Sequence, residues 1–306
     1  MKISVIGSGN VGATAALFMA VKELAKIVLV DVVEGLPQGK ALDMMQASPL
    51  SRFDNVIMGS NDYGDTAGSE LVVITAGLAR KPGMSRLDLL RKNATIVRSV
   101  VEEVVKYSPQ AKIVMVTNPL DVMTYLAFKV SGFKREKVLG MGGVLDSSRF
   151  RYFLAEEMKV PVRETSALVI GMHSELMLPL PEHCTVSGKP IPEIISREQI
   201  DNLINRTRKA GAEIVGFLKT GSAYVAPAAS IAEMAEIIVR DKKEILPASV
   251  YLQGEYGLEG ICIGVPVRLG KEGVEEIIPL DLNSEEKATL HKAEAEIKEA
   301  LKNLGI

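Results

Sequence analysis

The chain has 306 residues, of which 47% are hydrophobic and 24% are charged, and its formal net charge is −2. This length suits two closely packed domains or one large domain, and the composition is that of an ordinary soluble globular protein. The nearly balanced charge excludes a protein that depends on a strongly basic surface, so we expect no nucleic-acid or membrane partner.

Two further features bear on where the protein works. Cys184 and Cys262 are far apart in the sequence and form no C-x-x-C pair, which argues against a disulfide framework and fits a reducing compartment. No apolar run approaches the roughly 18 residues that a membrane span requires. Lys2 leads directly into an apolar run, so we expect no targeting segment and a cytoplasmic protein.

Strand and helix patterns alternate through the first half of the chain. Short apolar runs predict strands at 3–6, 26–31, 55–60, 70–77, 111–119 and 137–144. Helical spacing, with Pro37 and Gly132 placed near helix ends, predicts helices at 11–24, 33–48, 87–107 and 121–133. This alternation is typical of an α/β protein, and we expect a Rossmann-type doubly wound parallel sheet over residues 1–144.

The pattern changes near residue 145. A helix is predicted at 146–158, and antiparallel strands are predicted at 166–173, 178–191, 249–257, 260–270 and 274–282. Helical spacing returns at 197–219, 226–244 and 284–304, with Ser284 as the expected N-cap of the last helix. We therefore expect a second, mixed α+β domain over residues 145–306. Because no flexible linker precedes it, the two domains should pack directly, with a ligand site at the carboxyl ends of the parallel strands.

The segment that follows the first strand has the G-x-G-x-x-G spacing of a dinucleotide-binding loop. Gly7 permits the turn, Gly9 lets a pyrophosphate approach the backbone, and Gly12 lets the helix pack closely on the strand. The helix start offers its N–H groups to the phosphates. The alternative is a strand-to-helix turn that needs glycine for its backbone angles. The predicted cofactor-binding residues of the loop are Gly7, Ser8, Gly9, Asn10, Val11 and Gly12.

Asp31 favours the cofactor interpretation. It ends the second predicted strand, 19 residues beyond Gly12. A carboxylate at this position accepts hydrogen bonds from both ribose hydroxyls of NAD and repels the additional phosphate of NADP. No arginine follows immediately, so we expect NAD as the cofactor.

Hydride transfer with NAD requires a group on the protein that exchanges a proton, and histidine is the usual choice. The chain has three histidines. His291 lies in the charged C-terminal segment and His183 in a proline-rich turn, which leaves His173 as the candidate. His173 ends a predicted strand where the second domain should face the cofactor, although a hydrogen-bonded strand-end residue explains it equally well.

Asp146 and Arg149 are three residues apart, so a helix places both on one face. The aspartate can orient an imidazole and stabilise its charged form, and the arginine can bind a carboxylate through two hydrogen bonds. The alternative is an ion pair within the helix. Together with His173, the two residues make a candidate catalytic group.

Two segments at the carboxyl edge of the predicted sheet carry further candidates. The basic loop after the fourth strand contains Arg80, Lys81 and Arg86, and it is either a lid or a solvated basic loop. Asn118 follows the fifth strand. Its amide can bond a substrate oxygen or the nicotinamide ribose, or it can simply start the turn at Pro119.

Several segments along nearly the whole chain are more specific than the glycine loop alone. They are GSGNVG, TAGLARKPGMSR, VTNPLDVMTYL, GGVLDSSRFR, GMHSELMLPLP and KTGSAYVAPAAS, together with Asp31. With these segments the sequence resembles the lactate/malate dehydrogenase family, and in particular its malate branch. The resemblance implies NAD-dependent hydride transfer between malate and oxaloacetate without a metal site, in a homodimer or homotetramer. The alternatives are lactate or another 2-hydroxyacid as substrate, or an NAD-binding protein without turnover.

The resemblance also implies roles for single residues. His173 is the proton donor and acceptor and is held by Asp146. Arg149 binds the C1 carboxylate of the substrate. Arg86 polarises the keto oxygen once its loop closes, and Asn118 holds substrate and cofactor.

Other positions concern the cofactor and the choice of substrate. The resemblance implies that Asn93 and Val116 line the NAD site. Arg80 stands where lactate enzymes have glutamine, and its charge would meet the second carboxylate of oxaloacetate. Ala223 replaces a threonine typical of lactate enzymes and leaves room for a larger substrate. Ser174 departs from the family, which has glycine after the catalytic histidine, and this change predicts an altered turn or an altered rate.

Overall fold

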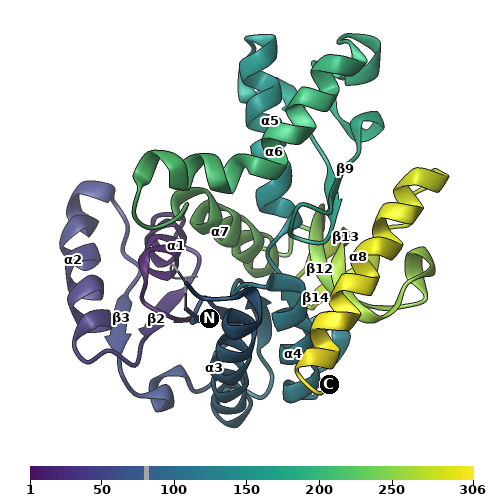
Figure 1. Ribbon diagram of the computed structural model, residues 1–306. Helices are drawn as coiled ribbons and strands as arrows, with labels where there is room; N and C mark the ends of the chain where they lie inside the picture. Colours follow the sequence, from purple (N-terminus) through teal and green to yellow (C-terminus); the bar gives the residue numbers. More distant parts are fainter. Residues whose placement is uncertain (79–82) are drawn as a thin grey trace.

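The computed structural model describes residues 1–78 and 83–306, arranged as Figure 1 shows. The α-helices are α1 (Asn10–Val21), α2 (Leu36–Ser51), α3 (Arg86–Tyr107), α4 (Leu120–Ser131), α5 (Gly143–Met158), α6 (Arg197–Leu218), α7 (Val225–Val239) and α8 (Ser284–Asn303). The strands are β1 (Lys2–Ile6), β2 (Lys26–Val30), β3 (Ile57–Ser60), β4 (Leu71–Ile74), β5 (Lys112–Met115), β6 (Val138–Gly140), β7 (Thr165–Ser166), β8 (Val169–Gly171), β9 (Met177–Pro179), β10 (Thr185–Val186), β11 (Lys189–Pro190), β12 (Glu244–Gln253), β13 (Glu259–Gly270) and β14 (Gly273–Ile277). Short 3-10 helices occur at Tyr63–Thr66, Arg135–Lys137, Val162–Glu164, Pro181–His183, Ile191–Glu193 and Glu255–Gly257.

One sheet runs through the whole molecule. Among the described residues it has 11 strands in the order β3-β2-β1-β4-β5-β6-β12-β13-β8-β9, with β14 paired to β13. The strands from β3 to β6 pair in parallel, in the order of a doubly wound dinucleotide-binding fold. The strands β12, β13, β8 and β9 pair antiparallel, and β7, β10 and β11 form a separate small sheet. The predicted α/β class, with a parallel sheet followed by a mixed α+β part, is confirmed.

Backbone pairing joins the two parts of the large sheet. Ser249 in β12 pairs with Gly140 in β6, the last of the parallel strands. A Cβ at Gly140 would come 3.0 Å from the Cβ of Ser249, so glycine allows these strands to lie close together. The two parts therefore meet through a shared sheet.

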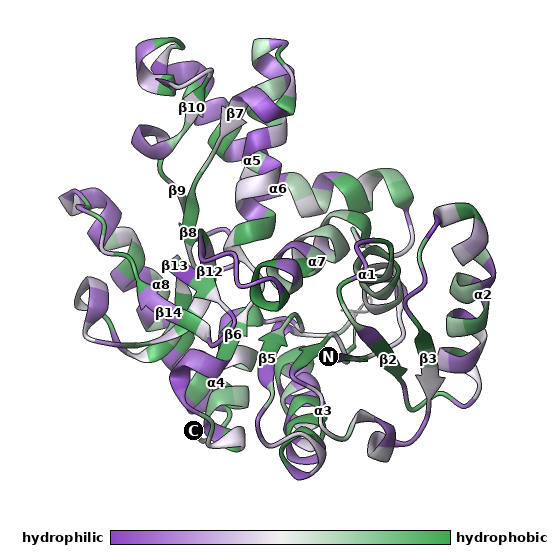
Figure 2. Cartoon of the chain, turned by 180° about the vertical axis from the view of Figure 1, so that it is seen from behind, coloured by the Kyte–Doolittle hydropathy of each residue, from purple (hydrophilic) through white to green (hydrophobic). Residues whose placement is uncertain are grey.

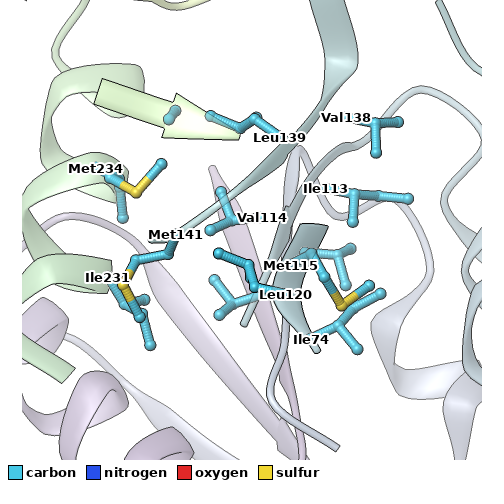
Figure 3. Close-up of a cluster of buried hydrophobic side chains, with 14 of the residues drawn as sticks. Ile74, Ile113, Val114, Met115, Leu120, Val138, Leu139, Met141, Ile231 and Met234 are labelled. Atoms are coloured by element: carbon cyan, nitrogen blue, oxygen red, sulfur yellow. The ribbon is translucent and has the colours of Figure 1, made fainter. Parts of the chain in front are cut away.

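The parallel strands are buried on both faces because helices cover both sides of the sheet. Helices α1 and α7 pack together on one side, and α3 and α4 pack together on the other (Figure 1). Figure 3 shows side chains of β4, β5 and β6 meeting Leu120 of α4 and both Ile231 and Met234 of α7. Hydrophobic colouring is accordingly concentrated along the central strands and the inner helices (Figure 2).

Helix α7 ends earlier than predicted. It ends at Val239 rather than at residue 244, because Asp241 and Lys243 adopt positive φ values and Glu244 already begins β12. Most of α7 is buried within the chain, packed against α1 and the sheet.

The N-cap of α8 is Asn283, not Ser284 as predicted. The Asn283 side chain accepts hydrogen bonds from the N–H groups of Glu285 and Glu286, and the Glu286 carboxylate accepts the Asn283 N–H at 2.8 Å. This reciprocal pair fixes the start of the helix one residue earlier than the serine would.

None of the helices in residues 1–78 and 83–306 combines the length and the hydrophobic character needed to traverse a lipid bilayer.

A second, smaller core lies between α5, α6 and the strands β8 to β10. It includes Phe150 from α5, Val169 from β8 and Leu203 from α6. Cys184 belongs to this core, whereas Cys262 lies in β13. Both cysteines are buried and free, as expected for packing residues. This core fixes α5 against α6, which positions one wall of the site described next.

Candidate active site

The glycine loop connects β1 to α1 at the carboxyl edge of the parallel strands. Gly7 has a φ of +105°, and a Cβ there would lie 2.6 Å from the Oγ1 atom of Thr75. A Cβ on Gly12 would overlap the carbonyl oxygen of Gly7, so glycine lets α1 approach the end of β1. Around Gly9, no heavy atom of the described residues lies within 4 Å of an added Cβ. A side chain at Gly7 or Gly12 would therefore clash with its neighbours, in line with the predicted need for glycine there. Beside Gly9 the loop leaves open space.

Asp31 lies directly after β2 and against this loop. Its Oδ2 accepts the N–H of Ser8 at 2.6 Å, and its Oδ1 accepts the N–H of Val33 at 3.0 Å. The Ser8 hydroxyl is buried and has no hydrogen-bond partner within the part of the chain that the structure describes. Asn10 and Val11 form the first turn of α1. An acid beside an open loop at a helix N-terminus fits a dinucleotide, with its ribose toward the acid and its phosphates toward the helix.

His173 and Asp146 form a close pair. The distance from His173 Nδ1 to Asp146 Oδ2 is 2.6 Å, and the other Asp146 oxygen lies 3.4 Å from Nη1 of Arg149. Asp146 is 2% exposed, so this carboxylate is shielded from water. Because Nδ1 is engaged, Nε2 is the ring nitrogen that remains for a ligand. The structure thus brings the three predicted residues of this group together.

The surroundings favour the protonated form of His173. Burial lowers the pKa of the imidazole, but the charge of Asp146 and its hydrogen bond, with a further contribution from Asp121, outweigh this effect. The pKa of His173 is therefore raised above its ordinary value. Such a group holds its proton to a higher pH than an ordinary histidine and can deliver it when a basic oxygen develops nearby.

Local backbone geometry explains why these side chains meet. Asp146 lies in the first turn of α5, and Arg149 follows on the same face. Gly142 precedes this helix, and a Cβ there would lie 3.2 Å from the Cβ of His173, so glycine lets the helix start lie against the histidine. On the other side, β8 ends at Gly171, whose φ is +84°, and His173 follows in the turn before β9.

Ser174 fits the turn after His173 without backbone strain. It does not share the positive φ values that some other non-glycine residues of the described chain adopt. Its N–H donates to the Met172 carbonyl at 2.7 Å, and its Oγ accepts the N–H of Leu176 at 3.1 Å. The serine that departs from the family pattern is therefore accommodated by hydrogen bonds of the turn itself.

Two neighbouring cavities share His173 and Arg86. The first, of about 450 Å³, also contains Arg149 and Arg208, and the second, of about 570 Å³, adds apolar side chains from α3 and α4. The Nε atoms of Arg149 and Arg208 are buried and have no partner among the described residues. Convergent guanidinium groups suit an anionic ligand, above all a carboxylate. Arg80, predicted to bind a second carboxylate, lies outside the described residues.

Three predicted residues of the cofactor site lie near the ends of β4 and β5. They are Asn118 and Val116, which follow β5, and Asn93 of α3. Asn118 is exposed, and Val116 is half-buried directly after β5. Asn93 is buried, and its amide donates to the carbonyls of Leu78 at 3.2 Å and Asn118 at 2.7 Å while its Oδ1 accepts the Leu78 N–H at 2.8 Å. These bonds occupy both amide hydrogens, so Asn93 shapes the backbone of the predicted cofactor site and has no amide hydrogen left for a ligand. Ala223 is half-buried just before α7.

The fold brings two further residues to this site that were not predicted from the sequence. Asp121 in α4 accepts the N–H of His173 at 2.8 Å. Arg208 in α6 lines the first cavity beside Arg149. The position of Asp121, just after the end of the fifth strand, was a usable signal. Arg208 has no such signal, because the packing of α6 on α5 alone brings it to the cavity.

Comparison with protein families assigns both parts of the chain. Residues 1–140 match the NAD binding domain of lactate/malate dehydrogenase, and residues 143–304 match the alpha/beta C-terminal domain of the same family. The first match gives the class, a dehydrogenase with a dinucleotide-binding domain. With the second match added, the chain belongs to the lactate/malate dehydrogenase family.

Individual relatives are similar over their full length. Malate dehydrogenase from Pelodictyon phaeoclathratiforme is 54% identical over 305 residues, covering 99% of this chain and 98% of the relative. Malate dehydrogenase from Methanosarcina mazei is 51% identical over 306 residues, covering all of both chains. These curated relatives support a malate dehydrogenase of this family.

Solved structures match equally well in both branches of the family. Malate dehydrogenase from Salinibacter ruber superimposes with a TM-score of 0.95 at 49% identity, covering 100% of this chain and 98% of the other. Lactate dehydrogenase from Cryptosporidium parvum, solved with lactic acid and NAD, gives a TM-score of 0.95 at 44% identity, covering 99% and 98%. The backbone is therefore common to malate and lactate enzymes, and the choice of substrate depends on side chains.

Proposed function

We propose that the protein is an NAD-dependent malate dehydrogenase that interconverts malate and oxaloacetate. The observation that carries the proposal is the 2.6 Å contact between His173 and Asp146, in a cavity that Arg149 and Arg86 also line. Reduction of a 2-keto acid needs a proton for the carbonyl oxygen and a cationic site for the carboxylate, and this arrangement offers both. The curated relatives described above, which are named malate dehydrogenase, support the same substrate.

The proton passes through Nε2 of His173. In oxaloacetate reduction, protonated His173 donates to the carbonyl oxygen, and Asp146 keeps the ring oriented and stabilises its charge. In malate oxidation, neutral His173 accepts the hydroxyl proton. Arg149 holds the carboxylate next to the reacting carbon, and Arg86 polarises the carbonyl. The raised pKa of His173 favours the proton-donating form.

NAD, when bound, accepts or supplies the hydride. The loop from Gly7 to Gly12 and the N-terminus of α1 would hold its pyrophosphate, and Asp31 would accept hydrogen bonds from its ribose hydroxyls. The carboxylate of Asp31 would repel the additional phosphate of NADP. Asn118 would hold the nicotinamide end, beside backbone that Asn93 and Val116 shape.

The choice of malate over lactate rests on Arg80, whose guanidinium would pair with the second carboxylate of oxaloacetate. Pyruvate lacks that carboxylate and would leave the arginine unpaired. A site built around a polar group rejects an analogue without its partner by roughly 10⁴-fold. Replacing Arg80 with glutamine is therefore expected to move the preference toward pyruvate, and the small side chain of Ala223 leaves room for the larger substrate.

The direct test is a spectrophotometric assay of the purified protein with NADH and oxaloacetate, repeated with pyruvate and with NADPH. We expect turnover with oxaloacetate and NADH, and much lower kcat/KM when either pyruvate or NADPH is substituted. A higher kcat/KM with pyruvate would identify a lactate-type enzyme. Binding of NADH, followed by fluorescence, without turnover of either keto acid would identify a non-catalytic NAD-binding protein.

Assembly and location complete the proposal. We infer a homodimer or homotetramer that acts on a small molecule in the cytoplasm, without a nucleic-acid or membrane partner. The resemblance to the family supports the assembly. Light scattering coupled to size-exclusion chromatography measures the assembly directly, and a monomeric mass would contradict it.

A further inference from the structure

A second buried carboxylate contacts the main chain of the proposed proton donor. Asp121 is the second residue of α4 and is 2% exposed. Its Oδ2 accepts the N–H of His173 at 2.8 Å, and its Oδ1 accepts the Ser249 hydroxyl at 2.7 Å. Both oxygens are therefore used. Within residues 1–78 and 83–306, no lysine or arginine forms an ion pair with this carboxylate.

These two bonds tie three distant parts of the chain together. Asp121 comes from α4, Ser249 from β12 and His173 from the turn after β8. Asp146 holds the ring of His173 through Nδ1, whereas Asp121 holds its backbone N–H. His173 is thus fixed at its ring and at its main chain by carboxylates from two helices. A neutral acceptor would suffice for the backbone bond, so the buried charge calls for another explanation.

Charged side chains from several elements surround His173. Asp146 and Arg149 face it from α5 and Asp121 from α4. The other charged side chains that line the same cavities come from α3, the turn after His173, α6 and α8, and they are Arg86, Glu175, Arg208, Lys292, Glu296 and Glu299.

Both buried aspartates favour the charged imidazole, whereas Arg149 opposes it. Burial raises the pKa of Asp121 itself to about 6, although the Ser249 and His173 bonds act against this rise. Cys262 also lies near Asp121, but burial raises the pKa of its thiol so that it stays neutral. At neutral pH, Asp121 is therefore an anion close to the imidazole.

We propose that Asp121 is a positioning residue that, with Ser249, anchors the main chain of His173 and provides a second negative charge that sustains its protonated form. The inference rests on the proposed role of His173 as proton donor. Ser249 serves the arrangement by donating to Asp121, which keeps the carboxylate ionised in spite of its burial.

Replacement of Asp121 by asparagine separates the two parts of this role. The carboxamide has nearly the same shape, so its oxygen can accept the His173 N–H while its NH₂ group donates to the Ser249 oxygen. The anchor is kept and the charge is lost. One charge within this site is worth about one pKa unit, so we expect the titration midpoint of His173 to fall by that amount.

The kinetic consequence has opposite signs in the two directions. Reduction needs protonated His173, so above the midpoint kcat/KM for oxaloacetate should fall about tenfold in Asp121→Asn. Oxidation needs neutral His173, so below the wild-type midpoint kcat/KM for malate should rise about tenfold. A merely structural defect would lower both values at every pH and would overturn the proposal.

The midpoint itself can be measured without turnover, by NMR titration of histidine-labelled protein. The His173 resonance is assigned by its loss in His173→Gln. We expect a lower midpoint in Asp121→Asn. The matched control is Asp65→Asn, in which the midpoint should be unchanged. Asp65 lies in the 3-10 helix after β3, and its carboxylate also accepts a serine hydroxyl, that of Ser60. An unchanged midpoint in Asp121→Asn contradicts the inference, whereas absence of oxaloacetate turnover by the wild-type protein contradicts the proposed function.

Ser249→Ala provides a second variant should Asp121→Asn fail to fold. It keeps the carboxylate and the His173 bond but removes one donor, so Asp121 takes up a proton at a higher pH. We expect a smaller fall of the His173 midpoint, in the same direction. A midpoint equal to or higher than that of the wild-type protein contradicts the role assigned to this pair.

Discussion

Two buried carboxylates of this chain have opposite surroundings. Glu236 in α7 is 5% exposed and forms ion pairs with Lys22, Arg240 and Lys242. The hydrogen bond from Lys22 has the largest effect, and together with the other cations it outweighs burial and lowers the pKa of Glu236 to about 2. This carboxylate joins α1 to α7, so its charge is neutralised where it holds two helices together.

Asp121 in α4 is as deeply buried, but its partners are neutral. It accepts one backbone N–H, from His173, and one hydroxyl, from Ser249. Burial raises its pKa to about 6, the opposite direction from Glu236. Cations thus neutralise the buried carboxylate of Glu236, which holds two helices together. The buried carboxylate of Asp121 has no such cation among the described residues and lies beside the group that we propose to exchange a proton. Such a charge is retained for function at a cost in stability.

The largest effect on activity is expected from the third buried carboxylate, Asp146. Replacing it with asparagine removes the charge that orients the His173 ring and stabilises its protonated form. We expect kcat for oxaloacetate reduction at pH 7 to fall by about 10³-fold, within the range for loss of acid–base catalysis. Binding of NADH, measured by fluorescence titration, should change little. A fall in kcat of less than about tenfold would show that the pair does not carry the proton transfer.

Glu236→Gln should affect stability and not activity. The variant leaves three cations beside a neutral amide, and we expect the free energy of unfolding in urea at pH 7 to fall by about 2 kcal/mol, reduced from the value for a fully buried pair because the cations are partly exposed. Because the folded pKa is depressed, this stabilisation is present above about pH 4.5 and is lost as the pH falls toward 2. Oxaloacetate turnover should be unchanged.

Glu233→Gln is the matched control for this prediction. Glu233 also pairs with Lys22, at 3.6 Å, but its side chain is 44% exposed. We expect a loss of less than about 0.5 kcal/mol from this exposed pair. Equal losses in the two variants would mean that burial of Glu236 adds nothing to the ion pair.

The effect expected on the stability of Asp121→Asn has the opposite sign. The folded pKa of Asp121 is raised, so ionisation of the carboxylate costs nothing below its ordinary pKa of 3.8 and costs progressively more up to about pH 6. The asparagine variant avoids this cost, so we expect it to gain at most about 3 kcal/mol in urea unfolding at pH 8 and nothing at pH 4. If the free energy of unfolding of the variant, relative to that of the wild-type protein, is lower at pH 8 than at pH 4, the ionised Asp121 stabilises the fold as Glu236 does, and the contrast is wrong.

Local patterns predicted most of the fold because they depend on local physics. Apolar runs with glycine and proline between them located the parallel strands, and the close approach of Gly12 to the carbonyl oxygen of Gly7 is a contact within one strand–loop–helix unit. The C-terminal end of α7 was predicted wrongly. The residues 240–244 are all charged, so apolar periodicity carries no signal there and could not find Asp241 and Lys243, whose backbone ends the helix.

The candidate site was predictable where its residues lie close in the sequence. Asp146 and Arg149 share one helix face, and His173 was selected by its place at a strand end. Arg208 was missed because only the packing of separate elements brings it to the cavity. The place of Asp121 just after the fifth predicted strand was a signal, but it did not indicate the contact with His173. No spacing rule relates residues that meet only through tertiary structure, and the sequence does not show that a carboxylate will be buried without a cation.

The most direct test of the account is the pH dependence of kcat/KM in both directions with the wild-type protein. If His173 exchanges the proton, oxaloacetate reduction should be lost as the pH rises through the pKa of His173, and malate oxidation should be lost as the pH falls through the same value. The two profiles should therefore have opposite limbs that cross near one midpoint. If both directions lose activity on the same side of neutrality, His173 is not the group that exchanges the proton.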